Sequence, residues 1–337
     1  MEITKKYIVG THVMFYEVDM IGEFMQALKN SIDEITNQEN ITVDFVFNLC
    51  EYFGKINIEE ISKEELKNKF KQHLKVFDGL NINLKVAYYE DSDPYTMIDY
   101  RRDLNYYGCQ THDYVIWGES DSLLPKQTFH ALETLSQYTD QNNIHRFITT
   151  FAIRKMWDSS WTPLEHIDFE DKEYYEKDNP LCWSEQHSIR YTMSIEEMNR
   201  VNEKYDDYDI RMLDRPQFDG SCLILSSDLI KAGVNIHPGI WGIAAEDTSL
   251  MYSCMQILGN NYRQFIFKNL LKVHNREHKD KRKYILDYNS QEKSTQSHKG
   301  KWNDVMRDLN KENLSIIIGN PNKKILTYKD FETSIAN

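Results

Sequence analysis

The chain has 337 residues, of which 40% are apolar and 28% are charged, as in an ordinary globular protein. Its formal net charge of −13 makes it a poor general binder of nucleic acid. Its five cysteines, none of them in a CxxC pair, argue against a zinc or disulfide framework. No apolar run approaches the ~18–20 residues that cross a bilayer, and no signal peptide is recognisable, so we expect a cytoplasmic protein.

Strand and helix patterns alternate along the first third of the chain. β-Branched and aromatic residues predict four strands, over residues 6–15, 41–49, 82–89 and 113–117. Helices are predicted between them, including one that begins at Ser62 with Glu65 as its capping-box partner and one over 99–108. This alternation predicts an α/β fold with a mainly parallel sheet. Ligands of such sheets bind beyond the carboxyl ends of the strands, so the residues after Trp117 are candidates for a site.

The later part of the chain is less regular. Helices are predicted over 125–138, 228–232 and 248–258, and strands over 218–226 and 265–271. After Lys272 the composition turns basic and clear periodicity is lost. A short apolar run within 313–319 receives no assignment.

Two carboxylates one residue apart follow the strand that ends at Trp117. In an extended or turning backbone Glu119 and Asp121 point to the same side, which creates a hard-oxygen site for Mg²⁺ or Mn²⁺. Such an ion completes its shell with phosphate oxygens and water, so it can neutralise a departing diphosphate. The alternative is that Asp121 caps the next helix and that Glu119 is a solvated turn residue.

A second acidic pair, Glu246 and Asp247, opens the predicted helix that continues to residue 258. A carboxylate in this position could remove the proton from an acceptor hydroxyl, provided that it lies in a cleft beside a group that sets its pKa. The alternative is helix capping with a favourable dipole interaction.

Basic residues and histidines follow the predicted strand 265–271. Residues 272–285 carry six Lys and Arg against two Asp and Glu, a local excess of positive charge that favours an anionic ligand over a plain surface turn. A neutral histidine in this stretch could complete a metal site. Upstream, an arginine of the pair Arg101-Arg102 could reach a diphosphate from the helix before Glu119.

In their order and spacing, these elements resemble the GT-A glycosyltransferases, and most of all the large family-2 type. The resemblance covers roughly residues 5–275. It rests on Arg102-Asp-Leu-Asn with Gly108, on DYVIWGESDSLLP (113–125) and on GSCLILSSDLIKAGVNIHPGIWGIAAEDTSL (220–250). It implies a Rossmann-like GT-A fold with a mostly parallel central sheet flanked by helices. It also implies transfer of a sugar from a UDP- or GDP-sugar to a hydroxyl of a saccharide or other acceptor.

The resemblance implies roles for single residues. Glu119-Ser120-Asp121 would hold Mn²⁺ or Mg²⁺ and the donor diphosphate, and His274 would complete the metal shell, with His278 as its competitor. Asp247 would be the acceptor base, with Glu246 beside it, as in inverting members. The residues that would line the nucleotide and diphosphate pocket are Thr11, His12, Asn48, Arg101 and Arg102.

Two positions depart from the family pattern. Glu119 replaces an Asp, and Asn48-Leu-Cys50 replaces an Asp-rich strand end. The expected organisation is a catalytic domain over 1–275 and a C-terminal extension or lid over 276–337. The nucleotide-sugar half of the catalytic domain would be 1–125, and its acceptor half 126–275.

Three other functions are compatible with the same sequence. The acceptor could be a modified base in DNA, with residues 272–283 on the phosphates, although the net charge disfavours it. A sugar-phosphate nucleotidyltransferase is disfavoured because residues 10–14 contain one Gly and no basic residue to cradle a triphosphate. An inactive module that binds nucleotide sugars is the third, favoured by Glu119 in place of Asp.

Overall fold

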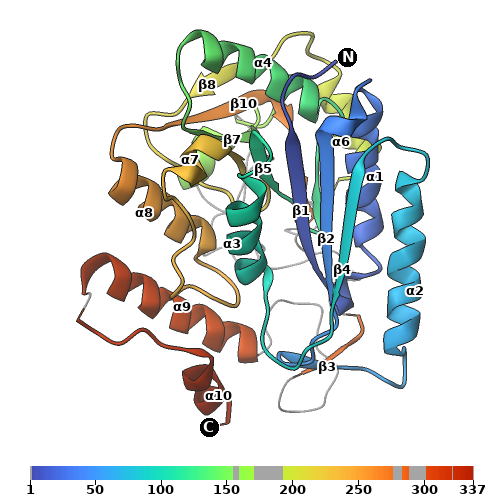
Figure 1. Cartoon of the computed structure of the whole chain (residues 1–337), viewed down its shortest axis with the longest axis vertical. Coiled ribbons are helices and arrows are strands. Elements are labelled where there is room, and N and C mark those ends of the chain that lie inside the picture. Colours follow the sequence, from blue (N-terminus) through green and yellow to red (C-terminus); the bar gives the residue numbers. More distant parts are fainter. Residues whose placement is uncertain are drawn as a thin grey trace.

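The computed structural model describes residues 2–154, 159–170, 193–275, 283–287, 301–320 and 322–336. The strands of its central sheet are β1 (Tyr7–Met14), β2 (Ile41–Asn48), β4 (Asn83–Tyr89), β5 (Tyr114–Trp117), β7 (Phe147–Ala152), β8 (Ile210–Met212), β9 (Ile224–Ser226) and β10 (Arg263–Leu271). They lie in the order β4-β2-β1-β5-β9-β7-β10-β8. Only β9 and β8 run antiparallel to their neighbours. The expected α/β class, with a mostly parallel central sheet flanked by helices, is confirmed (Figure 1).

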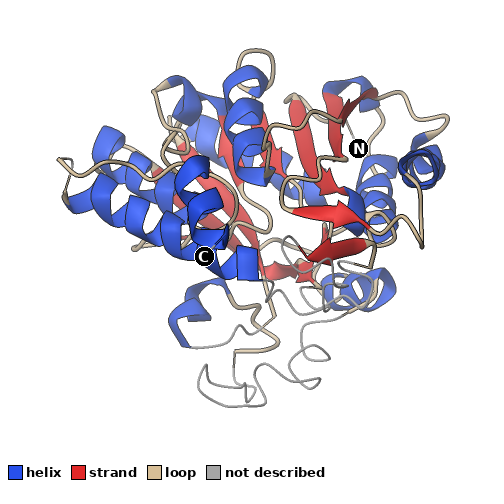
Figure 2. Ribbon diagram, turned by 90° about the horizontal axis from the view of Figure 1, so that it is seen from below, coloured by secondary structure: helices blue, strands red, loops and turns tan. Residues whose placement is uncertain are grey.

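Alternating side chains of the sheet enter two separate cores. Tyr7 and Val9 of β1 face one core, and Ile8 faces the other. The first core is covered by α1 (Ile21–Asp33), α2 (Lys63–Leu74) and α4 (Thr128–Gln141). The second is covered by α3 (Met97–Gly108), α7 (Ser227–Lys231) and α8 (Glu246–Leu258). Helices thus cover both faces of the sheet (Figures 1 and 2), and the central strands β1, β7 and β10 are buried almost throughout.

Local signals of the sequence correspond closely to the observed helix ends. The N–H of Glu65 donates to Ser62 Oγ at 3.2 Å, and the N–H of Ser62 donates to Glu65 Oε2 at 2.9 Å, which is the predicted capping box of α2. Gly233, with a φ of 101°, follows α7 in the left-handed conformation that ends helices.

The structure differs from the sequence-based expectation in the later half. Only 224–226 of the strand expected over 218–226 pairs with neighbouring strands as β9. The chain turns at residues 220–221, where the N–H of Ser221 donates to Asp219 Oδ1 at 3.1 Å. The buried strand β7 has no counterpart among the predicted elements. The run within 313–319 is the last part of a long helix, α9 (Lys301–Gly319), which is followed by α10 (Tyr328–Ala336).

The two C-terminal helices pack beside the carboxyl edge of the parallel strands, below α3 and α8 in Figure 1. Met306 of α9 and Phe331 of α10 form a small core with Phe53 and Trp241. A two-stranded ribbon of β3 (Gly54–Ile56) and β12 (Ile285–Asp287) lies on the same edge. None of the helices in the described part of the chain has the length and apolar character that crossing a membrane requires.

Candidate active site

Glu119 and Asp121 lie directly after β5, at the carboxyl edge of the parallel strands. β6 (Ser122–Leu123) follows them and pairs antiparallel with β11 (Val273–His274), so that His274 lies opposite Ser122. The N–H of Asn275 donates to the carbonyl oxygen of Asp121 at 2.7 Å. This two-residue ribbon brings His274 beside carboxylates from a distant part of the sequence.

Glu119, Asp121 and His274 each offer one ligand atom, and these atoms lie within 4.8 Å of one another. His274 Nε2 is 3.4 Å from Asp121 Oδ1 and 3.7 Å from Glu119 Oε2. Two carboxylates and an imidazole at this spacing fit a divalent cation such as Mn²⁺ or Mg²⁺, with positions left for other oxygen ligands. The structure thus brings the three expected metal ligands into one cluster. The competing His278 lies outside the described residues.

Arg101 of α3 lies between this cluster and the second acidic pair. Its side chain is 1% exposed and lies over the Trp117 ring, 4.9 Å from the ring centre. Nη1 donates to Glu246 Oε1 at 2.9 Å, and Nη2 is 3.9 Å from Glu119 Oε2. Nε and Nη2 have no hydrogen-bond acceptor among the described residues. Buried donors without an acceptor are costly, and phosphate oxygens suit the guanidinium geometry well.

Glu246 and Asp247 are the first residues of α8, which Ala245 precedes in the left-handed conformation with a φ of 68°. Glu246 is buried and Asp247 is half-buried. The N–H of Thr248 donates to Asp247 Oδ1 at 2.6 Å. A Cβ atom at Gly220 would lie 2.9 Å from Glu246 Oε1 and 3.6 Å from Asp247 Oδ2. Both carboxylates therefore face this glycine, and a larger residue would crowd them.

The surroundings of Glu246 and Asp247 raise the pKa of both carboxyl groups. Burial, and then the neighbouring Asp247, raise the pKa of Glu246 to about 7, while Arg101 opposes the rise. Burial also raises the pKa of Asp247, and the hydrogen bond from the Thr248 N–H opposes that rise. Carboxylates with raised pKa values in a partly buried place are suited to proton transfer.

A buried ion pair that the sequence analysis did not single out supports the cluster from behind. Lys272 is fully buried, its Nζ is 2.5 Å from Asp219 Oδ2, and it also donates to Ser221 Oγ. Burial opposes ionisation of Asp219, but Lys272 and then His274 hold the pKa of its carboxyl at about 2. Lys272 directly precedes β11, so the pair fixes the strand that carries His274. In the sequence, the only indication of this ion pair is the lysine directly before Val273 and His274.

Three nucleotide-pocket candidates, Thr11, His12 and Asn48, lie toward the carboxyl ends of β1 and β2. Asn48 Nδ2 donates to the Tyr95 carbonyl at 2.6 Å and is 3.0 Å from His12 Nε2, while Asn48 Oδ1 accepts from the N–H of Cys50 at 2.8 Å. Burial, and then Arg101, lower the pKa of His12 to about 3, so this ring is neutral. Because the amide nitrogen of Asn48 can only donate, His12 Nε2 accepts this hydrogen bond, and the proton of the neutral His12 ring is on Nδ1. The Asn48 side chain is therefore engaged within the protein.

The two remaining candidates are Arg102 and Ser120. Arg102 donates to the carbonyls of Ile236, His237 and Ile240, so it supports the backbone over 236–240 rather than the metal-ligand cluster. Ser120 is buried in the turn between the two carboxylates.

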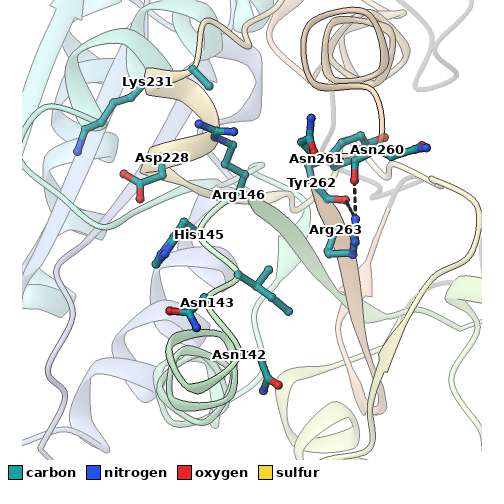
Figure 3. Close-up of a pocket in the computed structure, with 12 residues that line it drawn as sticks. Asn142, Asn143, His145, Arg146, Asp228, Lys231, Asn260, Asn261, Tyr262 and Arg263 are labelled. Atoms are coloured by element: carbon teal, nitrogen blue, oxygen red, sulfur yellow. Dashed lines mark hydrogen bonds between the residues drawn. The ribbon is translucent and has the colours of Figure 1, made fainter.

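A separate hollow of about 660 Å³ lies at the opposite edge of the sheet, where β7 and β10 begin (Figure 3). Its lining includes three cationic side chains, those of Arg146, Lys231 and Arg263, together with Asp228 and four asparagines. Arg263 Nη1 donates to the carbonyls of Asn260 and Tyr262 at 2.6 and 2.8 Å. The helices α4, α7 and α8 end at this hollow, and cations near a helix C-terminus are favoured by the helix dipole. The charge of the hollow therefore follows from these helix ends.

The sequence matches no known family and no curated protein. Solved structures do resemble the fold. The structure of GalNAc-T7 with UDP, GalNAc and Mn²⁺ matches with a TM-score of 0.45 and 12% identity, over 98% of this chain and 54% of that one. That of S. aureus TarS (1–349) matches with a TM-score of 0.40 and 13% identity, over 94% and 73%. A mycobacterial protein matches with a TM-score of 0.39 and 12% identity, over 80% and 67%.

All three of these matches are distant. The chain spans only about half the length of the first of them. With TM-scores below 0.5 and identities of 12 to 13%, the likeness carries no information on the substrate or the reaction of this chain.

Proposed function

We propose that the chain is a metal-dependent glycosyltransferase that moves a sugar from a nucleotide diphosphosugar to an acceptor hydroxyl. The observation that carries the proposal is the cluster of Glu119, Asp121 and His274 at the carboxyl edge of the sheet, with the unpaired N–H groups of Arg101 beside it. A divalent cation and a buried guanidinium are together suited to neutralise a diphosphate as it leaves. Glu119 keeps a carboxylate oxygen within reach of the other ligands, so its replacement of Asp is compatible with an active enzyme.

Asp247 is the proposed base. Glu246 is held by Arg101 at 2.9 Å, whereas Asp247 is half-buried and its Oδ2 faces Gly220. The acceptor hydroxyl gives its proton to Asp247, and its oxygen bonds to the anomeric carbon as the bond from that carbon to the diphosphate oxygen breaks. A single displacement of this kind inverts the configuration of the sugar. The Arg101 guanidinium donates to the departing diphosphate.

The nucleotide would lie across the carboxyl ends of β1 and β2, where ligands of parallel sheets bind. Thr11, His12 and Asn48 would line this part of the pocket. We extend the same proposal to the domain halves, with the nucleotide sugar bound by residues 1–125 and the acceptor by 126–275. A UDP- or GDP-sugar as donor, a saccharide as acceptor and a cytoplasmic location complete it.

The test is release of UDP or GDP from a panel of UDP- and GDP-sugars in the presence of Mn²⁺. The proposal predicts release from at least one of them, which EDTA stops and added Mn²⁺ restores. Nucleotide release at an unchanged rate in EDTA would show that the reaction does not need a metal ion. Failure of every sugar both to bind and to turn over would contradict the proposed function.

A further inference from the structure

The 239–245 loop, residues Gly239 to Ala245, leads directly into Glu246 and Asp247. Gly242, Ala244 and Ala245 all have positive φ angles, of 74°, 67° and 68°. The left-handed conformation costs a residue with a Cβ roughly 1–2 kcal/mol, so the two alanines remain in it only if the surroundings hold them. The contacts that hold them therefore also determine where the two carboxylates lie.

Asn310 of α9 makes several of these contacts. Its side chain is fully buried. Oδ1 accepts from the N–H of Trp241 at 3.2 Å, and Nδ2 donates to the carbonyls of Trp241, Ile243 (2.8 Å) and Ala244 (3.3 Å). Three carbonyls converge on one amide group only because the left-handed residues turn the chain. The Asn310 side chain is thus complementary to the strained form of the loop.

Other side chains of α9 touch the same loop. Asn313, also fully buried, donates through Nδ2 to the Gly239 carbonyl at 2.8 Å and to the Leu326 carbonyl at 2.9 Å. Met306 packs on Gly242 so closely that a Cβ atom there would overlap the Met306 sulfur. Met306, Asn310 and Asn313 are spaced by four and three residues, so they lie on one face of the helix.

The C-terminal helices also contact the helix that carries Arg101. The Trp241 ring lies 4.3 Å from the Tyr328 ring of α10, and Trp241 Nε1 donates to the Leu326 carbonyl at 3.0 Å. The Tyr328 hydroxyl donates to Asp99 Oδ2 of α3 at 3.0 Å. The 239–245 loop and α3 are therefore held against the same pair of helices, which fixes Glu246 relative to Arg101.

We infer that Asn310 is a positioning residue of the active site: through the 239–245 loop it sets the place of the Glu246 and Asp247 carboxylates relative to Arg101 and Gly220. Its catalytic consequence rests on the proposed function, whereas its hold on the loop stands on the hydrogen bonds alone. Through Asn310, helix α9 of the C-terminal extension helps to position the carboxylates of the proposed active site.

The experiment compares Asn310→Ala with Ile316→Ala, which truncates a buried side chain of the same helix that cannot form hydrogen bonds. Amide hydrogen exchange over residues 240–250 should be at least about tenfold faster in Asn310→Ala than in Ile316→Ala. Release of UDP from a UDP-sugar with Mn²⁺ should slow about 100-fold in Asn310→Ala only, since a misplacement near 1 Å costs that much. The Kd for UDP with Mn²⁺ should stay within about threefold.

If Asn310→Ala does not fold, Asn310→Asp takes its place and should differ from Ile316→Ala in exchange and turnover in the same way. The aspartate keeps the size of the side chain and the acceptor for the Trp241 N–H, but its carboxylate cannot donate to the carbonyls. Unchanged exchange over 240–250, or equal losses of turnover in Asn310→Ala and Ile316→Ala, would overturn the inference. If the wild-type protein neither binds nor turns over any UDP- or GDP-sugar, the proposed function fails. The exchange comparison then still decides whether Asn310 holds the loop.

Discussion

Arg101 connects the two acidic groups of the site through one buried side chain. It pairs with Glu246 at 2.9 Å and lies 3.9 Å from Glu119, so it offsets part of the negative charge that four carboxylates concentrate there. A buried cation with unsatisfied N–H groups favours an incoming anion, and a diphosphate supplies several acceptor oxygens. At the scale of single residues, the charge of the site is arranged for an anionic ligand that carries its own cation.

The role of Asp247 can be separated from donor binding. Asp247→Asn keeps the shape of the side chain and an acceptor for the Thr248 N–H, but it cannot take a proton. We expect donor binding to be unchanged and sugar transfer to fall by about 10²–10⁴-fold, the usual contribution of a general base. Single-turnover transfer and titration with UDP measure the two effects separately. Transfer at the wild-type rate would assign the base to another group.

The raised carboxyl pKa values predict a pH dependence. Burial and Asp247 raise the pKa of Glu246 to about 7, and burial raises that of Asp247, so the pair takes up protons as the pH falls below neutrality. A protonated base cannot take up the proton of the acceptor hydroxyl, and kcat/KM should therefore fall about tenfold per pH unit once the pH lies below the raised pKa of Asp247. A profile that stays flat down to about pH 4, the ordinary pKa of an aspartate, would show that no carboxyl of raised pKa takes part.

At the scale of elements, the active site depends on pairings that local sequence does not encode. The strands up to β5, the helix starts and the turn that carries Glu119 and Asp121 follow from hydrophobic periodicity, capping residues and composition within a few residues. The meeting of His274 with Asp121 depends on the two-residue pairing of β6 with β11, which is too short to leave a periodic pattern. The resemblance to a family, and not the periodicity of the sequence, singles out His274 as an expected metal ligand.

α9 was missed for a different reason. Its buried face includes Asn310 and Asn313, whose polarity interrupts the apolar pattern by which a helix is recognised. Both asparagines are there because they bond to loop carbonyls, a tertiary requirement. Lys272 is fully buried although lysines are rarely buried, because the carboxylate of Asp219 compensates its charge.

The ion pair of Lys272 with Asp219 predicts a large effect on stability. Lys272→Met leaves the buried Asp219 carboxylate without its cation, although Ser221 still donates to it, and this should cost about 3–5 kcal/mol of unfolding free energy at pH 7. Adding Asp219→Asn should recover part of the loss. Urea unfolding measures both, and a loss below about 1 kcal/mol would contradict a compensating role for the pair. Since the folded pKa of Asp219 is depressed to about 2, this stability is present above the unfolded value and disappears as the pH falls toward 2.

Across the whole molecule, the two edges of the sheet carry different sets of side chains. The carboxyl edge, viewed in Figure 2, gathers the metal-ligand cluster, Arg101 and the acidic pair, together with the C-terminal helices that hold the 239–245 loop. The opposite edge carries the ends of α4, α7 and α8 and the cationic hollow that they border. A chain of net charge −13 thus keeps the buried guanidinium of Arg101, of which Nη1 donates to Glu246, beside the carboxylates that would hold a cation.

The central claim is that Glu119, Asp121 and His274 bind a divalent cation that in turn holds a nucleotide diphosphate. Calorimetric titration of UDP and of GDP into the wild-type protein and Asp121→Ala, each with and without Mn²⁺, tests it most directly. At least one nucleotide should bind the wild type at least about tenfold more tightly with Mn²⁺, whereas Asp121→Ala should keep its fold and lose this gain. Equal affinity with and without Mn²⁺, or a full Mn²⁺ effect in Asp121→Ala, would contradict it.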